Sequence, residues 1–263
     1  MNEIDNPVLR KLEAGMLAVG IGVRIARTVE IARAMHNAGY DWLFLDLEHG
    51  TMPLDAIAQI AVVALEVGIA PIVRVPPGEY TMATRALDNG ALGIILPHVD
   101  TADAAREAVD RLKYPPLGHR SIGGTGAVLG FRPERIAHSM AALNRATLTI
   151  VMLETPQAIA NAHAIAAVPG VDIVLIGTND LCAELGIPGT FDAPEIVAAY
   201  TQLVAACKAA GKRAGMAGVA DEALMRRYIA MGVQFVLAGS DFPLLIAAAA
   251  QRCARVRGAG SAG

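Results

Sequence analysis

Acidic residues, a histidine and an arginine follow short apolar runs in this sequence, and side chains of these types can do chemistry together. Asp46 and His49 come after the run WLFL, and Arg74 comes after PIV. Glu154 ends the run IVMLE, and Asp180 closes IVLIGTND. Two neighbouring carboxylates repel each other unless a cation or a proton lies between them. A histidine beside them can move a proton near neutral pH, and an arginine can hold a substrate oxyanion.

Glu154 and Asp180 are the candidate metal ligands. Ligation by oxygen atoms, with room left for water and substrate, suits Mg²⁺ or Mn²⁺, with Co²⁺ as an alternative. Each residue also has a structural interpretation, because Glu154 could pair with an arginine and Asp180 could cap a helix that begins at Leu181. For either residue alone the two interpretations carry equal weight. Their occurrence after successive apolar runs favours the metal.

His49 is the candidate general base, although a lone histidine is more often structural. Arg74 could equally form a salt bridge to a nearby carboxylate. Schiff-base chemistry needs a desolvated lysine in the active site. It is disfavoured because no lysine follows one of the apolar runs directly; the lysines are Lys11, Lys113, Lys208 and Lys212.

The elements that must position these residues are short apolar strands alternating with longer amphipathic stretches. Runs such as IVMLE and IVLIG are apolar throughout, which is typical of parallel strands covered on both faces. Thr101, Asp192 and Asp221 are suitable residues to begin helices. The predicted strands span residues 16–23, 42–47, 70–75, 92–99, 147–153, 172–176, 213–219 and 234–238.

Eight such units in 263 residues favour a closed (β/α)₈ (TIM) barrel of the α/β class over an open doubly wound sheet. We expect one barrel domain over residues 1–256 and a flexible C-terminal tail over residues 257–263. The carboxyl ends of barrel strands carry the active site. The candidate residues all follow strands, so we expect them to meet at one rim of the barrel.

The connection between the fourth and fifth strands is long and rich in proline and glycine, over residues 113–140. Long ordered loops in compact domains are often functional. Its Gly-Gly-Thr-Gly segment, residues 123–126, is a weak signal for phosphate binding because no clear strand precedes it. A flexible active-site loop is the preferred interpretation.

Composition excludes several classes of protein. The apolar fraction of 54% rules out disorder, and a net charge of −3 provides no basic surface for nucleic acid or anionic lipid. The apolar runs are shorter than a membrane span, and the first residues do not resemble a signal peptide. The three cysteines match neither a disulfide framework nor a zinc site. We therefore expect a cytoplasmic protein.

Several motifs in one order resemble the HpcH/HpaI aldolase family, the metal-dependent (class II) pyruvate aldolases of the phosphoenolpyruvate/pyruvate barrel superfamily. The resemblance runs from about residue 11 to about residue 250. Together the motifs are far more specific than any one alone. They are YDWLFLDLEHG, PIVRVP, ALDNGALGIILPHVDTADAA, KYPPLGHRSIGG, VMLETPQA and IGTNDLCAELG.

The resemblance implies roles for the proton-transfer residues. His49 matches the family's catalytic base, and Asp88 matches the aspartate that raises the basicity of that base. Asp46 lies in the same motif as His49 and is expected to orient it. Arg74 matches the arginine that stabilises the enolate. These roles together describe a proton-transfer site beside an oxyanion site.

The resemblance also implies how the oxo acid is held. Glu154 and Asp180 match the two metal-binding carboxylates. The backbone at Gly177, Thr178 and Asn179 matches the segment that receives the carboxylate of a 2-oxo acid. The implied cofactor is therefore a divalent metal, Mg²⁺ or Mn²⁺, and the implied partners are a small 2-oxo acid and an aldehyde.

The chain departs from the family pattern beside these residues. Met152 stands where a glutamine usually precedes the metal-binding glutamate, which removes a polar contact to the substrate. Thr178, Asn179 and Cys182 replace the usual residues around the metal-binding aspartate. These changes leave the acceptor aldehyde undetermined.

The implied activity is that of a class II aldolase (EC 4.1.2 type), which reversibly cleaves a 4-hydroxy-2-oxo acid to pyruvate, or a close analogue, and an aldehyde through a metal-stabilised enolate. The alternatives are an acyl-CoA lyase of the malyl- or citramalyl-CoA type and a non-catalytic barrel that binds an oxo acid. The family forms hexamers or related assemblies such as trimers of dimers. A homo-oligomer also agrees with the low charged fraction of 18%.

Overall fold

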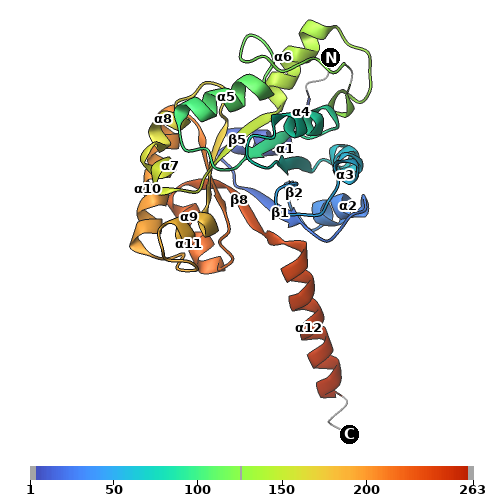
Figure 1. Cartoon of the computed structure of the whole chain (residues 1–263). Helices are drawn as coiled ribbons and strands as arrows, with labels where there is room; N and C mark the ends of the chain where they lie inside the picture. Colours follow the sequence, from blue (N-terminus) through green and yellow to red (C-terminus); the bar gives the residue numbers. More distant parts are fainter. Residues whose placement is uncertain (1–3, 125, 260–263) are drawn as a thin grey trace.

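The computed structural model describes residues 4–124 and 126–259, and within these ranges eight parallel strands close into a barrel (Figure 1). Each strand pairs with its neighbour in sequence, and β8 pairs with β1. The predicted (β/α)₈ barrel is therefore confirmed, and the open sheet is wrong. The strands are β1 (Ala18–Val23), β2 (Trp42–Asp46), β3 (Ala70–Arg74), β4 (Gly93–Leu96), β5 (Leu148–Leu153), β6 (Ile173–Gly177), β7 (Arg213–Ala217) and β8 (Val233–Ser240).

Helices surround the barrel and cover the outer faces of most strands (Figure 1). Those before residue 124 are α1 (Pro7–Glu13), α2 (Glu30–Asn37), α3 (Leu54–Val67), α4 (Tyr80–Asp88) and α5 (Ala102–Leu112). Those that follow are the 3₁₀ helix η1 (Ala127–Leu129), α6 (Ile136–Ala146), α7 (Pro156–Ala160), α8 (Ala162–Ala166), α9 (Thr178–Glu184), α10 (Pro194–Ala210), α11 (Glu222–Met231) and α12 (Asp241–Ala259).

The strands form where the sequence predicts them, because their apolar side chains are buried on both faces. Every residue of β2, β3, β5 and β6 is buried. β4 is shorter than predicted and ends at Leu96, since the next residue, Pro97, has no backbone N–H for the ladder. His98 then takes a positive φ of 52°, which is uncommon for a residue other than glycine.

The barrel interior is filled by large side chains below the rim. Trp42 stacks on Phe235 with ring centroids 4.1 Å apart. At the amino ends of the strands, α1 covers the interior with the buried side chains of Val8 and Leu12. Asn6 fixes this helix, because its side chain accepts hydrogen bonds from the first turn of α1 and donates to the carbonyls of Leu92 and Ala146. Within the described residues, α1 therefore covers the barrel interior at the amino ends of the strands.

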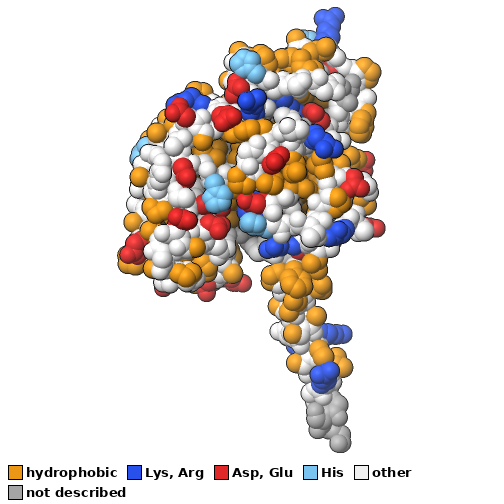
Figure 2. Space-filling model, in the orientation of Figure 1, with side chains coloured by type: hydrophobic (Ala, Val, Ile, Leu, Met, Phe, Trp, Pro, Cys, Tyr) orange, Lys and Arg blue, Asp and Glu red, His pale blue; other side chains and the backbone are white. Residues whose placement is uncertain are grey.

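The last helix departs from the barrel pattern. α12 follows β8 but extends away from the barrel instead of packing on it (Figure 1). Its first half is largely hydrophobic on the visible face (Figure 2). Phe242, Leu244, Leu245 and Ile246 are each about half exposed, at 48–57%.

The C-terminal boundary differs from the one predicted at residue 257. Residues 257–259 continue α12, and residues 260–263 lie outside the described residues. Within residues 4–124 and 126–259, no helix combines the length and the apolar character that a membrane span requires.

Candidate active site

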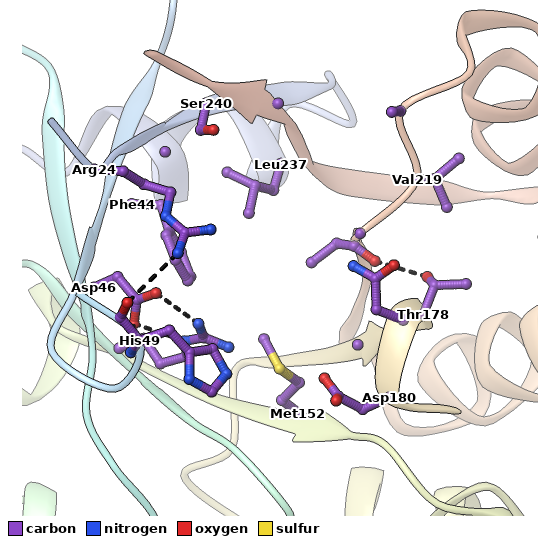
Figure 3. A pocket seen from close by; sticks show the side chains of 18 of the residues that line it. Arg24, Phe44, Asp46, His49, Met152, Thr178, Asp180, Val219, Leu237 and Ser240 are labelled. Carbon is purple, nitrogen blue, oxygen red and sulfur yellow. Dashed lines mark hydrogen bonds and ion pairs between the residues drawn. The ribbon is translucent and has the colours of Figure 1, made fainter. Parts of the chain in front are cut away.

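The polar residues at the carboxyl ends of the strands line one pocket with a volume of about 310 Å³ (Figure 3). Acidic, basic and histidine side chains gather about the middle of this face of the barrel (Figure 2). The pocket therefore brings together residues that lie far apart in the sequence. The predicted site residues that line it are Asp46, His49, Arg74, Glu154, Gly177, Thr178, Asn179 and Asp180.

Asp46 and Arg74 form the most completely bonded pair of the pocket. Arg74 donates from Nε to Asp46 Oδ1 at 3.0 Å and from Nη2 to Oδ2 at 2.6 Å. Its Nη1 lies 3.1 Å from Glu48 Oε2, and its guanidinium lies over the ring of Phe44. The predicted salt bridge of Arg74 is therefore present, and the same arginine also faces the pocket.

This pairing keeps Asp46 ionised although only 3% of the residue is exposed. Burial opposes its ionisation, but the hydrogen bonds and the charge of Arg74 outweigh burial and lower the pKa of Asp46. The backbone N–H groups of Glu48 and His49 also donate to Asp46 Oδ1, at 3.0 and 3.4 Å. Asp46 thus holds the chain at His49 rather than the imidazole ring itself.

His49 projects into the pocket with its side chain about half exposed (Figure 3). Its Nε2 lies 3.9 Å from Glu48 Oε2. An imidazole in this position is open to a bound substrate and is held only loosely at its ring nitrogens. Such a group can accept or return a proton at an adjacent carbon or hydroxyl.

Glu154 is almost fully buried, with 1% of the residue exposed. Its Oε2 accepts a hydrogen bond from the backbone N–H of His98 at 2.8 Å and lies 3.4 Å from His98 Nδ1. Among the described residues no arginine forms an ion pair with Glu154, so the alternative interpretation of this residue is wrong. Burial, with the charges of Asp180 and Glu48 adding to it and His98 opposing it, raises the pKa of Glu154 to about 7.

Gly177 is required beside Glu154 for a steric reason. A Cβ atom at residue 177 would lie 2.6 Å from Glu154 Oε1 and 2.7 Å from its Cγ. Any larger side chain would push the carboxylate from its place. The glycine at the end of β6 therefore fixes where the Glu154 carboxylate lies.

Asp180 lies in the first turn of α9, which begins at Thr178 and not at Leu181. The N-cap position is Gly177, and no side chain caps this helix. The predicted capping role of Asp180 is therefore wrong, and its carboxylate lines the pocket instead (Figure 3).

Glu154 and Asp180 fit a hard divalent cation. Burial is the main cause of the raised pKa of Glu154, and the charge of Asp180 adds to it, so a cation between the two carboxylates would offset both. Within the described ranges there is no group of three or more His, Cys, Asp or Glu side chains that could hold a metal. An ion here would take its remaining ligands from water and substrate, which is the usual arrangement for Mg²⁺.

The segment at residues 177–179 presents mainly backbone to the pocket. The hydroxyl of Thr178 is turned inward, where it donates to the carbonyl of Ala217 at 2.7 Å and contacts the hydroxyl of Tyr200 at 2.7 Å. Met152 forms a buried apolar part of the pocket wall. An oxo acid bound here would face the backbone of residues 177–179 and the apolar side chain of Met152.

Asp88 is not brought to this pocket within the chain. It ends α4, at the side of the barrel where strands begin, and it accepts a hydrogen bond from Arg120 at 2.6 Å. Gly123 and Gly126 of the long loop lie against it, in a separate pocket. Neither Asp88 nor this described part of the loop lines the pocket with His49, so the predicted effect of Asp88 on His49 stays a prediction.

Three residues that line the pocket or contact its lining residues were not assigned roles from the sequence. His98 holds Glu154, because its backbone N–H donates to Glu154 Oε2. Glu48, in the same motif as His49, pairs with Arg74. Arg24, at the end of β1, lines the pocket opposite the carboxylates. For Arg24 the signal was available, because it directly follows the first predicted strand.

Comparison with known proteins gives consistent results. Residues 26–248 match the family model described as HpcH/HpaI aldolase/citrate lyase. The chain is 40% identical to the 4-hydroxy-4-methyl-2-oxoglutarate aldolase of Chaetomium globosum, over 93% of this chain and 92% of that protein. It is 35% identical to the 4-hydroxy-2-oxovalerate aldolase of Rhodococcus jostii, over 91% and 92%. The crystal structure of an aldolase from Desulfitobacterium hafniense superposes with a TM-score of 0.89 at 31% identity, covering 95% and 96%.

Proposed function

The chain belongs to the HpcH/HpaI aldolase/citrate lyase family, and we propose that it reversibly cleaves 4-hydroxy-2-oxo acids to pyruvate, or a close analogue, and a second carbonyl compound. The observation that carries this proposal is the pocket that combines a histidine, an arginine and two mutually repelling carboxylates. The chain's relatives carry the names of aldolases that act on such acids. The same pocket offers no lysine among its lining residues, which disfavours a Schiff-base mechanism.

We propose that Glu154 and Asp180 hold a divalent cation, Mg²⁺ or Mn²⁺. When bound, it supplies a Lewis acid that polarises the 2-oxo group of the substrate. The backbone at residues 177–179 lines the pocket beside these carboxylates and would receive the substrate carboxylate. This leaves carbon 3 and carbon 4 of the substrate toward His49 and Arg74.

Cleavage to pyruvate then requires two proton transfers and the breaking of one carbon–carbon bond. His49 takes the proton of the 4-hydroxyl group, the bond between carbons 3 and 4 breaks, and its electron pair forms the enolate of pyruvate. Arg74, held rigid by Asp46, stabilises the negative oxygen of that enolate. Return of the proton to carbon 3 gives pyruvate, and the former carbon 4 leaves as a carbonyl group.

The proposal is tested by pyruvate release from a panel of 4-hydroxy-2-oxo acids, with EDTA and with Mn²⁺ restored. We expect chelation to abolish turnover, Mn²⁺ to restore it, and His49→Ala to lose it. Exchange of the methyl protons of pyruvate with deuterated solvent tests the enolate step without any acceptor. Equal turnover in EDTA, or a lysine adduct trapped by borohydride, would overturn the metal mechanism.

We also propose that the protein is a homo-oligomer, such as a hexamer or a trimer of dimers. The support is α12, whose apolar side chains Phe242, Leu244, Leu245 and Ile246 are uncovered in the single chain. A helix following a barrel strand ordinarily buries such a face. Light scattering on the native protein and on Leu245→Glu tests this, and a monomeric native protein would refute it.

A further inference from the structure

Arg24 is an exposed cation in the pocket whose role the proposed reaction does not explain. It follows the end of β1, and its side chain extends into the pocket on the side away from Asp180 (Figure 3). Its Nη2 donates only a long hydrogen bond, 3.4 Å, to the carbonyl oxygen of His49. Among the ion pairs between described residues, none includes Arg24, so the guanidinium has donors left for a ligand.

The two arginines of the pocket differ in what they can still bind. Arg74 is buried and already bonded to Asp46 and lies against Glu48, so its charge is balanced within the protein. Arg24 carries a charge that no described carboxylate balances. An unbalanced guanidinium in a pocket favours a ligand with a carboxylate, which it can hold with two parallel hydrogen bonds.

The position of Arg24 in the pocket indicates which half of a bound substrate it would contact. The proposed metal and oxo-acid site is formed by Glu154, Asp180 and the backbone of residues 177–179, across the pocket. The contact with the His49 carbonyl places Arg24 on the histidine side, where the departing carbonyl compound lies. Ser240, paired with Gly22 on β1, adds a hydroxyl to the same side (Figure 3).

The backbone of Arg24 is fixed, so this placement is built into the fold. Asp241 at the start of α12 accepts hydrogen bonds from the N–H groups of Arg24, Ile25 and Ala26, at 2.9, 3.0 and 2.9 Å. An Asp that gathers three consecutive N–H groups holds the loop in one conformation. The Cα atom of Arg24 therefore has a fixed position on the rim of the barrel.

We propose that Arg24 binds a carboxylate on the acceptor half of the substrate, so that the enzyme prefers 4-hydroxy-2-oxo acids whose departing carbonyl compound is itself an oxo acid. This inference rests on the proposed aldolase function. The relative named for 4-hydroxy-4-methyl-2-oxoglutarate acts on a compound of this kind, because cleavage between its carbons 3 and 4 yields two oxo acids. The acceptor carboxylate would lie at Arg24 while the reacting carbon lies at His49.

The test compares two substrates that differ in one group. 4-Hydroxy-2-oxoglutarate releases glyoxylate, whereas 4-hydroxy-2-oxovalerate releases acetaldehyde, with a methyl group in place of the carboxylate. We expect Arg24→Met to lower kcat/KM for the first about tenfold or more and to leave the second within about threefold. Arg24→Lys should recover part of the loss, since it retains the charge.

Arg27→Met is the matched control. Arg27 lies in the same loop, is exposed, and bonds to Thr51 outside the residues that line the pocket. It should leave the ratio of kcat/KM for the two substrates unchanged. Exchange of pyruvate methyl protons with deuterated solvent should be equal in the native protein and in Arg24→Met, because this half reaction needs no acceptor.

The outcomes separate this inference from the function on which it rests. The inference would be overturned, with the aldolase intact, if the native protein exchanges pyruvate protons but Arg24→Met lowers kcat/KM equally for both substrates. The same holds if Arg24→Met lowers kcat/KM for neither substrate. Loss of proton exchange in Arg24→Met would instead assign Arg24 to the pyruvate half and also overturn it. Native protein with neither exchange nor cleavage would overturn the aldolase function and the inference with it.

Discussion

Replacing Asp46 by asparagine removes one charge from the most buried ion pair of the pocket and keeps the shape of the side chain. Asparagine still offers an oxygen to the N–H groups of Glu48 and His49, but the charged pairing with Arg74 is lost. Breaking a fully buried pair costs about 3–5 kcal/mol. Glu48 still lies 3.1 Å from the Arg74 guanidinium, so we expect a loss of about 2–3 kcal/mol in the free energy of unfolding.

The pH dependence of that loss has a defined sign. The pKa of Asp46 is lowered in the folded protein, so its stabilisation is complete above the pKa of about 3.9 that an aspartate has in the unfolded chain. It is lost as the pH falls through the lower pKa of the folded state. The difference between native protein and Asp46→Asn should therefore be constant from pH 5 to pH 8 and shrink below about pH 4.

Urea unfolding followed by circular dichroism, at one protein concentration and without metal, measures this difference. Asp5→Asn is the matched control, because Asp5 pairs with Arg10 on the surface and should contribute less than about 1 kcal/mol. A loss below about 0.5 kcal/mol for Asp46→Asn would refute the reasoning. A difference that changes between pH 5 and pH 8 would also refute it, since Asp46 does not titrate there.

Three further predictions concern the carboxylates and their support. Gly177→Ala should weaken Mn²⁺ binding about tenfold or more, because its Cβ would lie 2.6 Å from Glu154 Oε1. Electron paramagnetic resonance measures the dissociation constant, and a value for the variant equal to that of the native protein would contradict this prediction. The pKa of Glu154 is raised to about 7, so at lower pH Mn²⁺ must displace the proton of this carboxyl group in order to bind. The Mn²⁺ affinity, measured by calorimetry, should therefore rise as the pH increases from 5.5 to 7 and level off above pH 7. An affinity that does not change over this range would refute the prediction. Tyr200→Phe should cost about 1 kcal/mol in thermal unfolding with little change in turnover, because the Thr178 hydroxyl keeps its bond to the Ala217 carbonyl; a loss of turnover without a loss of stability would count against it.

The eight strands and the shared rim could be predicted from the sequence because both follow from local pattern. Continuous apolar runs are typical of strands buried on both faces, and parallel closure brings all their carboxyl ends to one side. Asp46, Arg74 and Glu154 therefore meet although more than a hundred residues separate the first from the last. No knowledge of individual contacts was needed for that inference.

The partners of individual side chains could not be predicted, because they depend on rotamers and packing. The pairing of Asp46 with Arg74, and of Glu154 with the backbone of His98, is set by side-chain directions within a few ångströms. The position of Asp88 shows a different limit. The resemblance implies an effect of Asp88 on His49, and this stays a prediction. Asp88 ends α4, and helices run antiparallel to the barrel strands, so within one chain it lies at the opposite side of the barrel.

The departure of α12 from the barrel had no signal in the sequence. Its apolar residues have the composition of a helix that packs on a strand, and only the three-dimensional structure shows that they are uncovered within one chain. Hydrophobic pattern predicts that a face will be buried. It does not tell whether the covering surface belongs to the same molecule.

The carboxylate of Asp241 connects the last helix to the loop that follows the first strand. It belongs to the last helix, yet the three N–H groups that it gathers belong to the loop after the first strand. A chain shortened before residue 241 would lose this acceptor as well as the helix, and the loop that carries Arg24 would be released. A change in the orientation of α12 would accordingly move the loop that carries Arg24 at the mouth of the pocket.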